Sequence, residues 1–106
     1  MRELCALTDI PNCEALAFPY GDKQTLVVTR RGLRAWAYVN RCPHAGVPLE
    51  WQEHRFMSLD RSQLQCSTHG ALFNVDNGYC TWGPCQGRSL QSLSIVIENG
   101  VIYLME

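Results

Sequence analysis

Two stretches of alternating side chains in the first half of the chain predict a β-hairpin. Residues 24–30 (QTLVVTR) and 33–39 (LRAWAYV) are rich in β-branched and aromatic residues, and they flank Arg31-Gly32. Runs of this composition around a short glycine-containing turn are typical of paired antiparallel strands. Successive side chains of the second run should point to opposite faces of the sheet.

The C-terminal part carries a second hairpin signal. Residues 93–98 (LSIVIE) and 101–105 (VIYLM) flank an Asn-Gly pair at 99–100. Asn-Gly between two β-rich runs predicts a type I′ turn, because both central residues of that turn need a positive φ. A second Asn-Gly pair, at 77–78, predicts the same kind of hairpin after ALFNV.

The rest of the pattern indicates an all-β fold with one irregular segment. No stretch has helical periodicity over more than about two turns. Residues 41–61 lack strand periodicity and are interrupted by Pro43, Gly46 and Pro48. An irregular segment of this length inside a compact β-domain is typical of a functional loop.

Length and composition restrict the function classes. The chain has 106 residues, enough for one domain over 1–106 and too few for two. Its formal net charge of −1 does not favour nucleic-acid binding. No apolar run approaches the roughly 20 residues of a membrane span, and Glu3, Asp9 and Glu14 interrupt the segment where a signal peptide needs an apolar core. We expect a cytoplasmic protein off the membrane, whose six cysteines are metal ligands or thiols rather than a disulfide scaffold.

Two short motifs combine cysteine with histidine. One residue separates Cys42 from His44, two residues separate Cys66 from His69, and 21 residues lie between the two motifs. Two thiolates with two imidazoles suit either zinc or an iron–sulfur centre. Zinc fingers pair like ligands, whereas each motif here mixes the two kinds. A centre with both histidines on one iron requires such mixing, because each of two facing loops can send its cysteine to one iron and its histidine to the other.

The two motifs resemble the ligand loops of a known family. The strings CPHAG (42–46) and CSTHG (66–70) are similar to the two cluster-binding loops of the Rieske [2Fe–2S] family. Downstream, Gly83-Pro84 is similar to the proline loop that covers the cluster in that family. The resemblance spans roughly residues 25–105.

The resemblance implies a fold, a cofactor and a set of site residues. The fold is an antiparallel Rieske-like β-sandwich with an inserted cluster-binding subdomain at about residues 41–84, and the cofactor is one [2Fe–2S] cluster. Glycines beside the ligands allow backbone N–H groups to approach the cluster sulfides, and a proline gives a rigid cover. The implied metal ligands are Cys42, His44, Cys66 and His69, and the implied cluster-contacting residues are Gly46, Gly70 and Pro84.

Other positions differ from the high-potential members of this family. Those members carry an extra cysteine in each ligand loop, joined as a disulfide, and this chain has Val47 and Thr68 there. They also place a serine and a tyrosine hydroxyl against cluster sulfurs, where this chain has Ala71 and Phe73. The reduced cluster is more negative than the oxidised one, so it is less stable when fewer hydrogen-bond donors contact its sulfurs. We therefore expect a midpoint potential near about −150 mV, at the lower end of the Rieske range.

Four cysteines lie outside the two motifs and leave two interpretations. Cys5, Cys13, Cys80 and Cys85 all suit the role of small buried apolar side chains. For Cys80 and Cys85, which flank TWGP, the alternative is a disulfide.

The segment between the motifs is longer than in the ferredoxin-like members of the family, and we expect residues 51–60 to bulge beside the cluster. Its Trp51, Phe56 and Met57 either pack beneath the ligand loops or form an apolar docking surface. Trp82 has the same two interpretations.

The sequence favours an electron carrier over an enzyme. It contains no nucleophile–base pair, no phosphate-binding glycine loop and no mononuclear-iron carboxylate triad. The resemblance implies a low-potential, one-electron ferredoxin between a flavin reductase and a terminal oxygenase, an analogy that the fold alone does not establish. Two alternatives stay open: a small Rieske-type subunit of a nitrite reductase-like enzyme, and a zinc-binding structural module.

Overall fold

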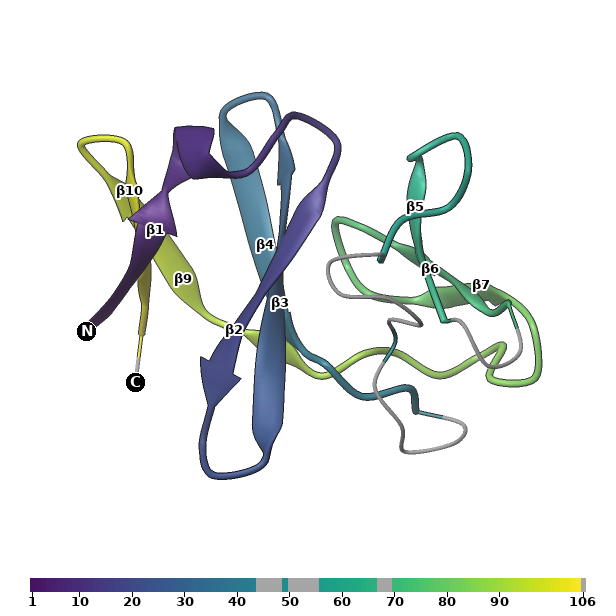
Figure 1. The fold of residues 1–106 in the computed structure, drawn as a ribbon. Helices are drawn as coiled ribbons and strands as arrows, with labels where there is room; N and C mark the ends of the chain where they lie inside the picture. The colour runs from purple at the N-terminus through teal and green to yellow at the C-terminus, as the bar shows by residue number, and fades with distance from the viewer. Residues whose placement is uncertain (44–48, 50–55, 67–69, 106) are drawn as a thin grey trace.

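The described part of the chain forms three small antiparallel sheets (Figure 1). The computed structural model describes residues 1–43, 49, 56–66 and 70–105. Within them, the only helix is a single 3-10 turn at Leu7–Asp9. The expected all-β class is therefore confirmed.

The first sheet joins the two ends of the chain. Its strands are β1 (Arg2–Ala6), β9 (Ile95–Glu98) and β10 (Val101–Leu104), in the order β1-β10-β9. The turn between β9 and β10 consists of Asn99 and Gly100, whose φ angles are 52° and 75°. Both are positive, as the type I′ turn predicted from Asn-Gly requires.

The second sheet is the centre of the fold. It contains β2 (Ala15–Tyr20), β3 (Gln24–Arg31), β4 (Arg34–Val39) and β8 (Ser92–Leu93), in the order β2-β3-β4-β8. The predicted hairpin forms from β3 and β4, but β3 extends one residue further than expected. Gly32, with a φ of 60°, is consequently the first of two turn residues, the position that a type II′ turn gives to glycine.

The first 20 residues form two strands that the sequence analysis did not predict. Strand β2 lies at the edge of its sheet and has a neighbouring strand on one side only. Pro19 is tolerated there because not every residue of an edge strand has to donate a backbone N–H to a neighbouring strand. A proline inside an apolar run weakens the pattern from which a strand is predicted. Strand β1 has only five residues and depends on β10 for pairing.

The third sheet is inserted between β4 and β8. It consists of β5 (Gln63–Gln65), β6 (Leu72–Asn74) and β7 (Cys80–Trp82), in the order β5-β6-β7. The hairpin predicted around Asn-Gly 77–78 exists as β6 and β7, but its loop is longer than two residues. Only Gly78 of the pair has a positive φ, of 72°, so the predicted type I′ turn is wrong.

Packing explains why this second Asn-Gly pair behaves differently. A Cβ atom on Gly78 would lie 2.8 Å from Cε1 of Tyr38 in the neighbouring sheet. The Gly78 N–H also donates to the Asn74 carbonyl at 2.9 Å. The glycine is therefore placed by tertiary contact as well as by the local turn.

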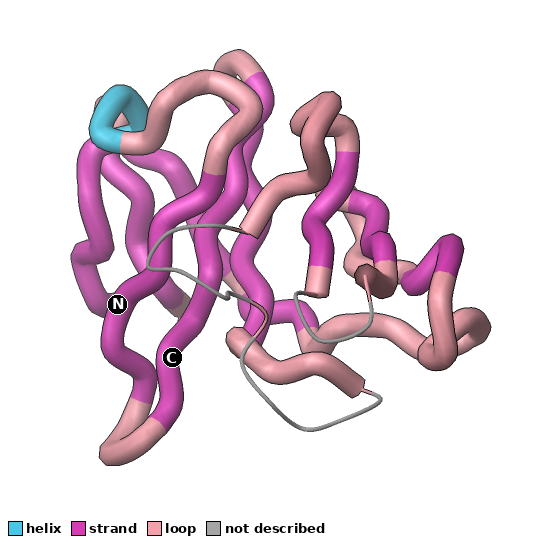
Figure 2. The backbone as a smooth tube through the Cα atoms, turned by 45° about the vertical axis from the view of Figure 1, so that its right-hand side comes forward, coloured by secondary structure: helices cyan, strands magenta, loops and turns pink. Residues whose placement is uncertain are grey.

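The central sheet is buried on both faces, because alternate residues of β3 and β4 enter two separate core clusters. Leu26 and Val28 pack with the first sheet, whereas Val27 and Tyr38 pack with the inserted β5–β7 subdomain. Figures 1 and 2 show that subdomain beside the central sheet, opposite the sheet that holds both termini.

Candidate metal centre

The two predicted cysteine ligands lie in one buried cluster. Cys42 follows β4, Cys66 follows β5, and both side chains are at most 1% exposed within the core of the inserted subdomain. The topology thus brings together two loops that are distant in sequence. His44, His69 and Gly46 lie outside the described residues.

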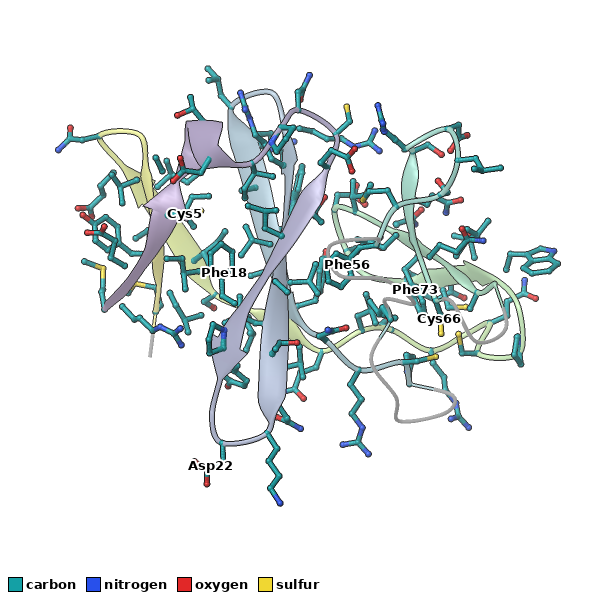
Figure 3. The ribbon with its side chains drawn as sticks, in the orientation of Figure 1. Cys5, Phe18, Asp22, Phe56, Cys66 and Phe73 are labelled. Atoms are coloured by element: carbon teal, nitrogen blue, oxygen red, sulfur yellow. The ribbon has the colours of Figure 1, made fainter. Side chains whose placement is uncertain are left out.

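The second ligand loop is the tip of the hairpin formed by β5 and β6. The Cys66 N–H donates to the Ala71 carbonyl at 2.8 Å, and the Gly70 N–H donates to the Cys66 carbonyl at 2.9 Å. Gly70 has a φ of 69°, which an L-residue adopts with strain. Figure 3 shows Cys66 in the part of the molecule that also holds Phe73, away from Cys5 in β1.

The first ligand loop is anchored by a residue that sequence reasoning missed. The Asn40 side chain is 6% exposed and donates from Nδ2 to Thr25 Oγ1 at 2.8 Å. Its Oδ1 accepts from the Leu49 N–H at 2.9 Å, so one amide closes the segment that holds the Cys42 motif. An asparagine directly after a predicted strand was the available signal. Arg88 adds a second tie by donating to the Pro43 carbonyl at 3.1 Å.

The proline loop contacts the second ligand loop through a glycine. Gly83 has a φ of 109°, and a Cβ atom there would lie 2.8 Å from Cα and 3.0 Å from Cβ of Ala71. Ala71 directly follows Gly70, so the loop that carries Pro84 lies against the base of the Cys66 hairpin. Pro84 itself is exposed.

Two further cysteines are part of the same core. The sulfurs of Cys80 and Cys85 are 2.8 Å apart, as thiols rather than as a disulfide. Burial, followed by the hydrogen bond with Cys80 and the charges of Cys80 and Cys42, raises the pKa of the Cys85 thiol to about 12. The prediction of buried small side chains is confirmed for both residues.

The apolar residues of the long inter-ligand segment divide between two environments. Phe56 is 1% exposed and Met57 packs against the same core, so both support the ligand loops from beneath. Trp51 lies outside the described residues, as does the whole first half of the expected bulge, 51–55. Trp82 is 59% exposed, which favours a place on a docking surface over packing beneath the ligand loops.

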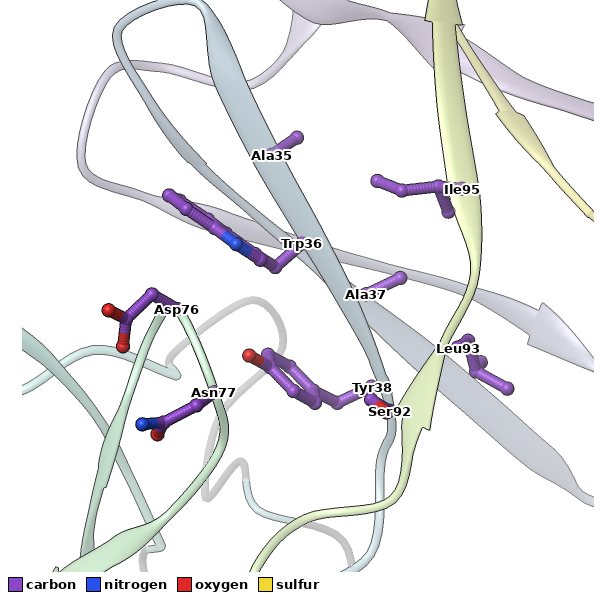
Figure 4. A pocket seen from close by; sticks show the side chains of 9 residues that line it. All are labelled: Ala35, Trp36, Ala37, Tyr38, Asp76, Asn77, Ser92, Leu93 and Ile95. Atoms are coloured by element: carbon purple, nitrogen blue, oxygen red, sulfur yellow. The ribbon is translucent and has the colours of Figure 1, made fainter.

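A cavity of about 470 Å³ lies between β4 and the loop that joins β6 to β7 (Figure 4). Its walls include Trp36 and Tyr38 on one side, and Asp76 and Asn77 on the other. Among the described residues, this lining contains no cysteine or histidine, so the cavity is separate from the ligand cluster.

Tyr38 joins the central sheet to the inserted subdomain. Its side chain is 1% exposed, and its hydroxyl donates to the Val75 carbonyl at 2.7 Å. Burial, followed by the charge of Asp76, raises the pKa of Tyr38 from 10.0 to about 12. The folded protein therefore keeps this proton to a higher pH than the unfolded chain, and its contribution to stability is lost as the pH rises from 10 towards 12.

We expect Tyr38→Phe to destabilise the fold by about 1–3 kcal/mol at neutral pH, because the buried Val75 carbonyl loses its donor. The difference in unfolding free energy between wild type and variant should then decrease by about 1.4 kcal/mol by about pH 11, since only the wild type loses the stabilisation from the Tyr38 proton. Urea unfolding across that pH range measures both effects. Tyr79→Phe, at a 43% exposed tyrosine, is the control and should change neither quantity. If the difference in unfolding free energy stays constant or increases with pH, this role of Tyr38 is wrong.

The donor set fits an iron–sulfur cluster. Cys42 and Cys66 supply two buried sulfurs in an apolar cluster, which is the environment that thiolate ligands of such clusters occupy. Within the described ranges, no group of three or more His, Cys, Asp or Glu side chains is arranged to hold a metal ion, and two members of the predicted set lie outside those ranges. No helix in the described part of the chain has the length and apolar character to cross a membrane.

Comparisons with known proteins identify the family of the chain. The family model for the Rieske [2Fe-2S] domain matches residues 1–97. Apoptosis-inducing factor 3 from Homo sapiens is 29% identical over 101 residues, which are 95% of this chain and 16% of that protein. The chain therefore spans about one-sixth of the length of this curated relative.

Solved structures share the fold over nearly the whole chain. A chain of the complex of reduced oxygenase and oxidized ferredoxin in carbazole 1,9a-dioxygenase is 24% identical with a TM-score of 0.79, over 96% of this chain and 89% of that one. The ferredoxin of carbazole 1,9a-dioxygenase from Nocardioides aromaticivorans IC177 is 22% identical with a TM-score of 0.76, over 98% and 97%. Because the family model covers most of the sequence, including both predicted ligand motifs, the chain belongs to the Rieske [2Fe–2S] domain family, and its cofactor is a [2Fe–2S] cluster.

Proposed function

We propose that the chain is a ferredoxin, which accepts one electron from a flavin reductase and passes it to a terminal oxygenase. The observation that carries this proposal is the burial of Cys42 and Cys66 in one apolar cluster, each at the start of a loop that holds a histidine. The bound cluster supplies one-electron chemistry. The chain's own contribution is to hold the ligands and to exclude water.

Within this proposal, Cys42 and Cys66 ligate one iron, and His44 and His69 ligate the other. The Asn40 and Arg88 contacts described above hold the first loop, and the β5–β6 hairpin holds the second. The cluster-binding subdomain is then about residues 41–84, in which Gly46 and Gly70 would allow the backbone to approach the cluster and Pro84 would supply the cover.

An exposed tryptophan supports docking beside the second ligand loop. A Cβ atom on Gly70 would lie 3.6 Å from Cζ3 of Trp82, and Trp82 is 59% exposed. A large exposed aromatic side chain is a frequent anchor at protein interfaces. The similar structure of an oxygenase in complex with a ferredoxin supports a terminal oxygenase as the partner. A cytoplasmic location, consistent with six cysteines used as ligands and thiols, completes the proposal.

The first test is a redox titration of purified, anaerobically handled protein. We expect iron and acid-labile sulfide in equal amounts, a one-electron transition, and a midpoint near about −150 mV. The physical reason is that Ala71 and Phe73, both fully buried, offer no hydroxyl to the cluster sulfurs. Phe73→Tyr should raise the midpoint by about 40 mV, the equivalent of one net hydrogen bond of about 1 kcal/mol at about 59 mV per tenfold change.

Phe18→Tyr is the matched control for this titration. Phe18 packs in the other core cluster, on the far side of the central sheet, so its hydroxyl should leave the midpoint unchanged. Colourless protein that contains zinc would instead support the structural-module alternative. A wild-type midpoint well above zero would contradict the low-potential assignment. Failure of the reduced protein to pass its electron to any ring-hydroxylating oxygenase would contradict the proposed partner and favour an enzyme-subunit role.

A further inference from the structure

The loop that follows β7 holds two thiols together through its backbone. The Cys80 N–H donates to the Arg88 carbonyl at 2.8 Å, and the Arg88 N–H donates to the Cys85 carbonyl at 2.9 Å. A third bond, from the Gln86 N–H to the Gly83 carbonyl at 3.1 Å, closes the turn between them. The two cysteines are therefore neighbours because the backbone is folded that way, without a covalent link between them.

The sulfur atoms are close enough to react with each other. Their separation is 2.8 Å, whereas a disulfide bond measures about 2.05 Å, so bond formation requires only a small movement of the two side chains. Both side chains are at most 1% exposed. The pair is also distinct from Val47 and Thr68, the positions that correspond to the disulfide of high-potential relatives.

We propose that Cys80 and Cys85 are a redox-active dithiol, which a small-molecule disulfide oxidises to an intramolecular disulfide across the Gly83-Pro84 loop. One cysteine sulfur attacks the small disulfide, forms a mixed disulfide and releases one small thiol. The second cysteine sulfur then attacks the mixed disulfide, which forms the protein S–S bond and releases the other small thiol. The protein gives up two electrons and two protons, and the small disulfide takes up both.

The location of Cys85 provides access for the oxidant. It is the one buried residue between positions 82 and 89, within a surface loop whose other residues are exposed or half-buried. A local opening of this short loop exposes the sulfur without unfolding a strand. Because both sulfurs are buried while the loop is closed, the opening of the loop is the controlling event.

The bond would tether the proline loop to β7. It closes a ring of residues 80–85 that contains Gly83, the residue in contact with Ala71 of the second ligand loop. Cytosolic disulfides usually form transiently, as redox sensors. Such a disulfide needs a reduced form that is also stable, and this pair is folded as two thiols. The other two cysteines outside the ligand motifs are half-buried, Cys5 in β1 and Cys13 just before β2, and they serve as internal controls.

The test uses the cluster-loaded protein, incubated with oxidised glutathione and then denatured anaerobically in excess alkylating reagent. Chymotrypsin cleaves after Tyr79 and after Trp82, which separates CTW (80–82) from GPCQGRSL (83–90). We expect the two peptides to appear joined in the unreduced digest and to separate on reduction. The intact protein should carry two fewer alkyl groups than untreated protein, and the cluster absorbance should be retained.

Variants identify the pair. Cys80→Ala should eliminate the joined peptide and Cys5→Ala should leave it unchanged. Absence of the joined peptide in oxidised wild-type protein that retains its iron would overturn the proposal, as would a link from Cys85 to Cys42 in its place. The measurement on the wild type needs no variant to fold. It also leaves the electron-transfer proposal untouched, because that proposal is tested by iron content and redox titration and not by peptide mass.

Discussion

Purified Cys66→Ala protein is expected to lose essentially all of its iron and acid-labile sulfide, together with its visible absorbance. Cys66 is fully buried where the loop of the β5–β6 hairpin begins, and alanine has no sulfur to offer a cluster. Because a cluster that binds only the folded state contributes to folding free energy, the thermal midpoint should fall to that of the apoprotein. Metal analysis and thermal unfolding measure the two effects.

Cys80→Ala is the matched control for this substitution. Cys80 is also fully buried in the same core cluster, and its replacement removes the same single atom. A modest packing loss of about 1 kcal/mol is expected in both variants, but only Cys66→Ala should lose iron. If Cys66→Ala keeps its full iron content, or if Cys80→Ala loses as much, the assignment of Cys66 as a ligand is wrong.

Gly83→Ala is expected to destabilise the folded protein by about 2–5 kcal/mol. The left-handed conformation at a φ of 109° accounts for about 1–2 kcal/mol, and overpacking against the neighbouring backbone accounts for a further ~1–3 kcal/mol. The new methyl group would lie 2.8 Å from Cα of Ala71, a backbone atom that cannot rotate away. The proline loop should therefore separate from the second ligand loop, with faster loss of iron on exposure to a chelator.

Gly87→Ala separates backbone strain from the clash. Gly87 lies four residues further along the same loop, has a φ of 94°, and has nothing within 4 Å of its hypothetical Cβ. This control should lose only the conformational part, about 1–2 kcal/mol, and should release iron at the wild-type rate. Equal destabilisation and equal iron loss in the two variants would show that the contact with Ala71 is unimportant. Urea unfolding and chelator kinetics provide both comparisons.

The hairpins differ in how much of their turn geometry could be predicted from the sequence. The turn at Asn99-Gly100 was predicted correctly, because both residues are on an exposed turn where local φ preferences decide the conformation. The same dipeptide at 77–78 was assigned the wrong turn type. There, Gly78 packs against Tyr38 of another sheet, so a long-range contact sets the loop length. Strand β2 was missed because Pro19 weakens its pattern, although the edge of a sheet tolerates proline.

The site shows a similar division. Cys42 and Cys66 were predicted as ligands from the two mixed motifs together with the family resemblance, and the structure places both in one buried cluster. The amide of Asn40, which closes the first loop onto Leu49, had no more than a weak turn signal. The Gly83 contact with Ala71 was not predicted, because two residues 12 positions apart become neighbours only after β6 and β7 have paired in this register.

The amino-acid sequence by itself determined the chemistry of this protein: which side chains can bind iron, that each loop offers one sulfur and one imidazole, and that the fold is all-β. These properties depend on residue type and short spacing, which folding does not alter. Only the tertiary structure decided that Cys80 and Cys85 face each other, that Tyr38 joins two subdomains, and that the proline loop requires glycine at position 83. Those properties are contacts whose distances depend on how the backbone folds: within the loop after β7 for the two thiols, across the β6–β7 hairpin for Gly83, and between two sheets for Tyr38.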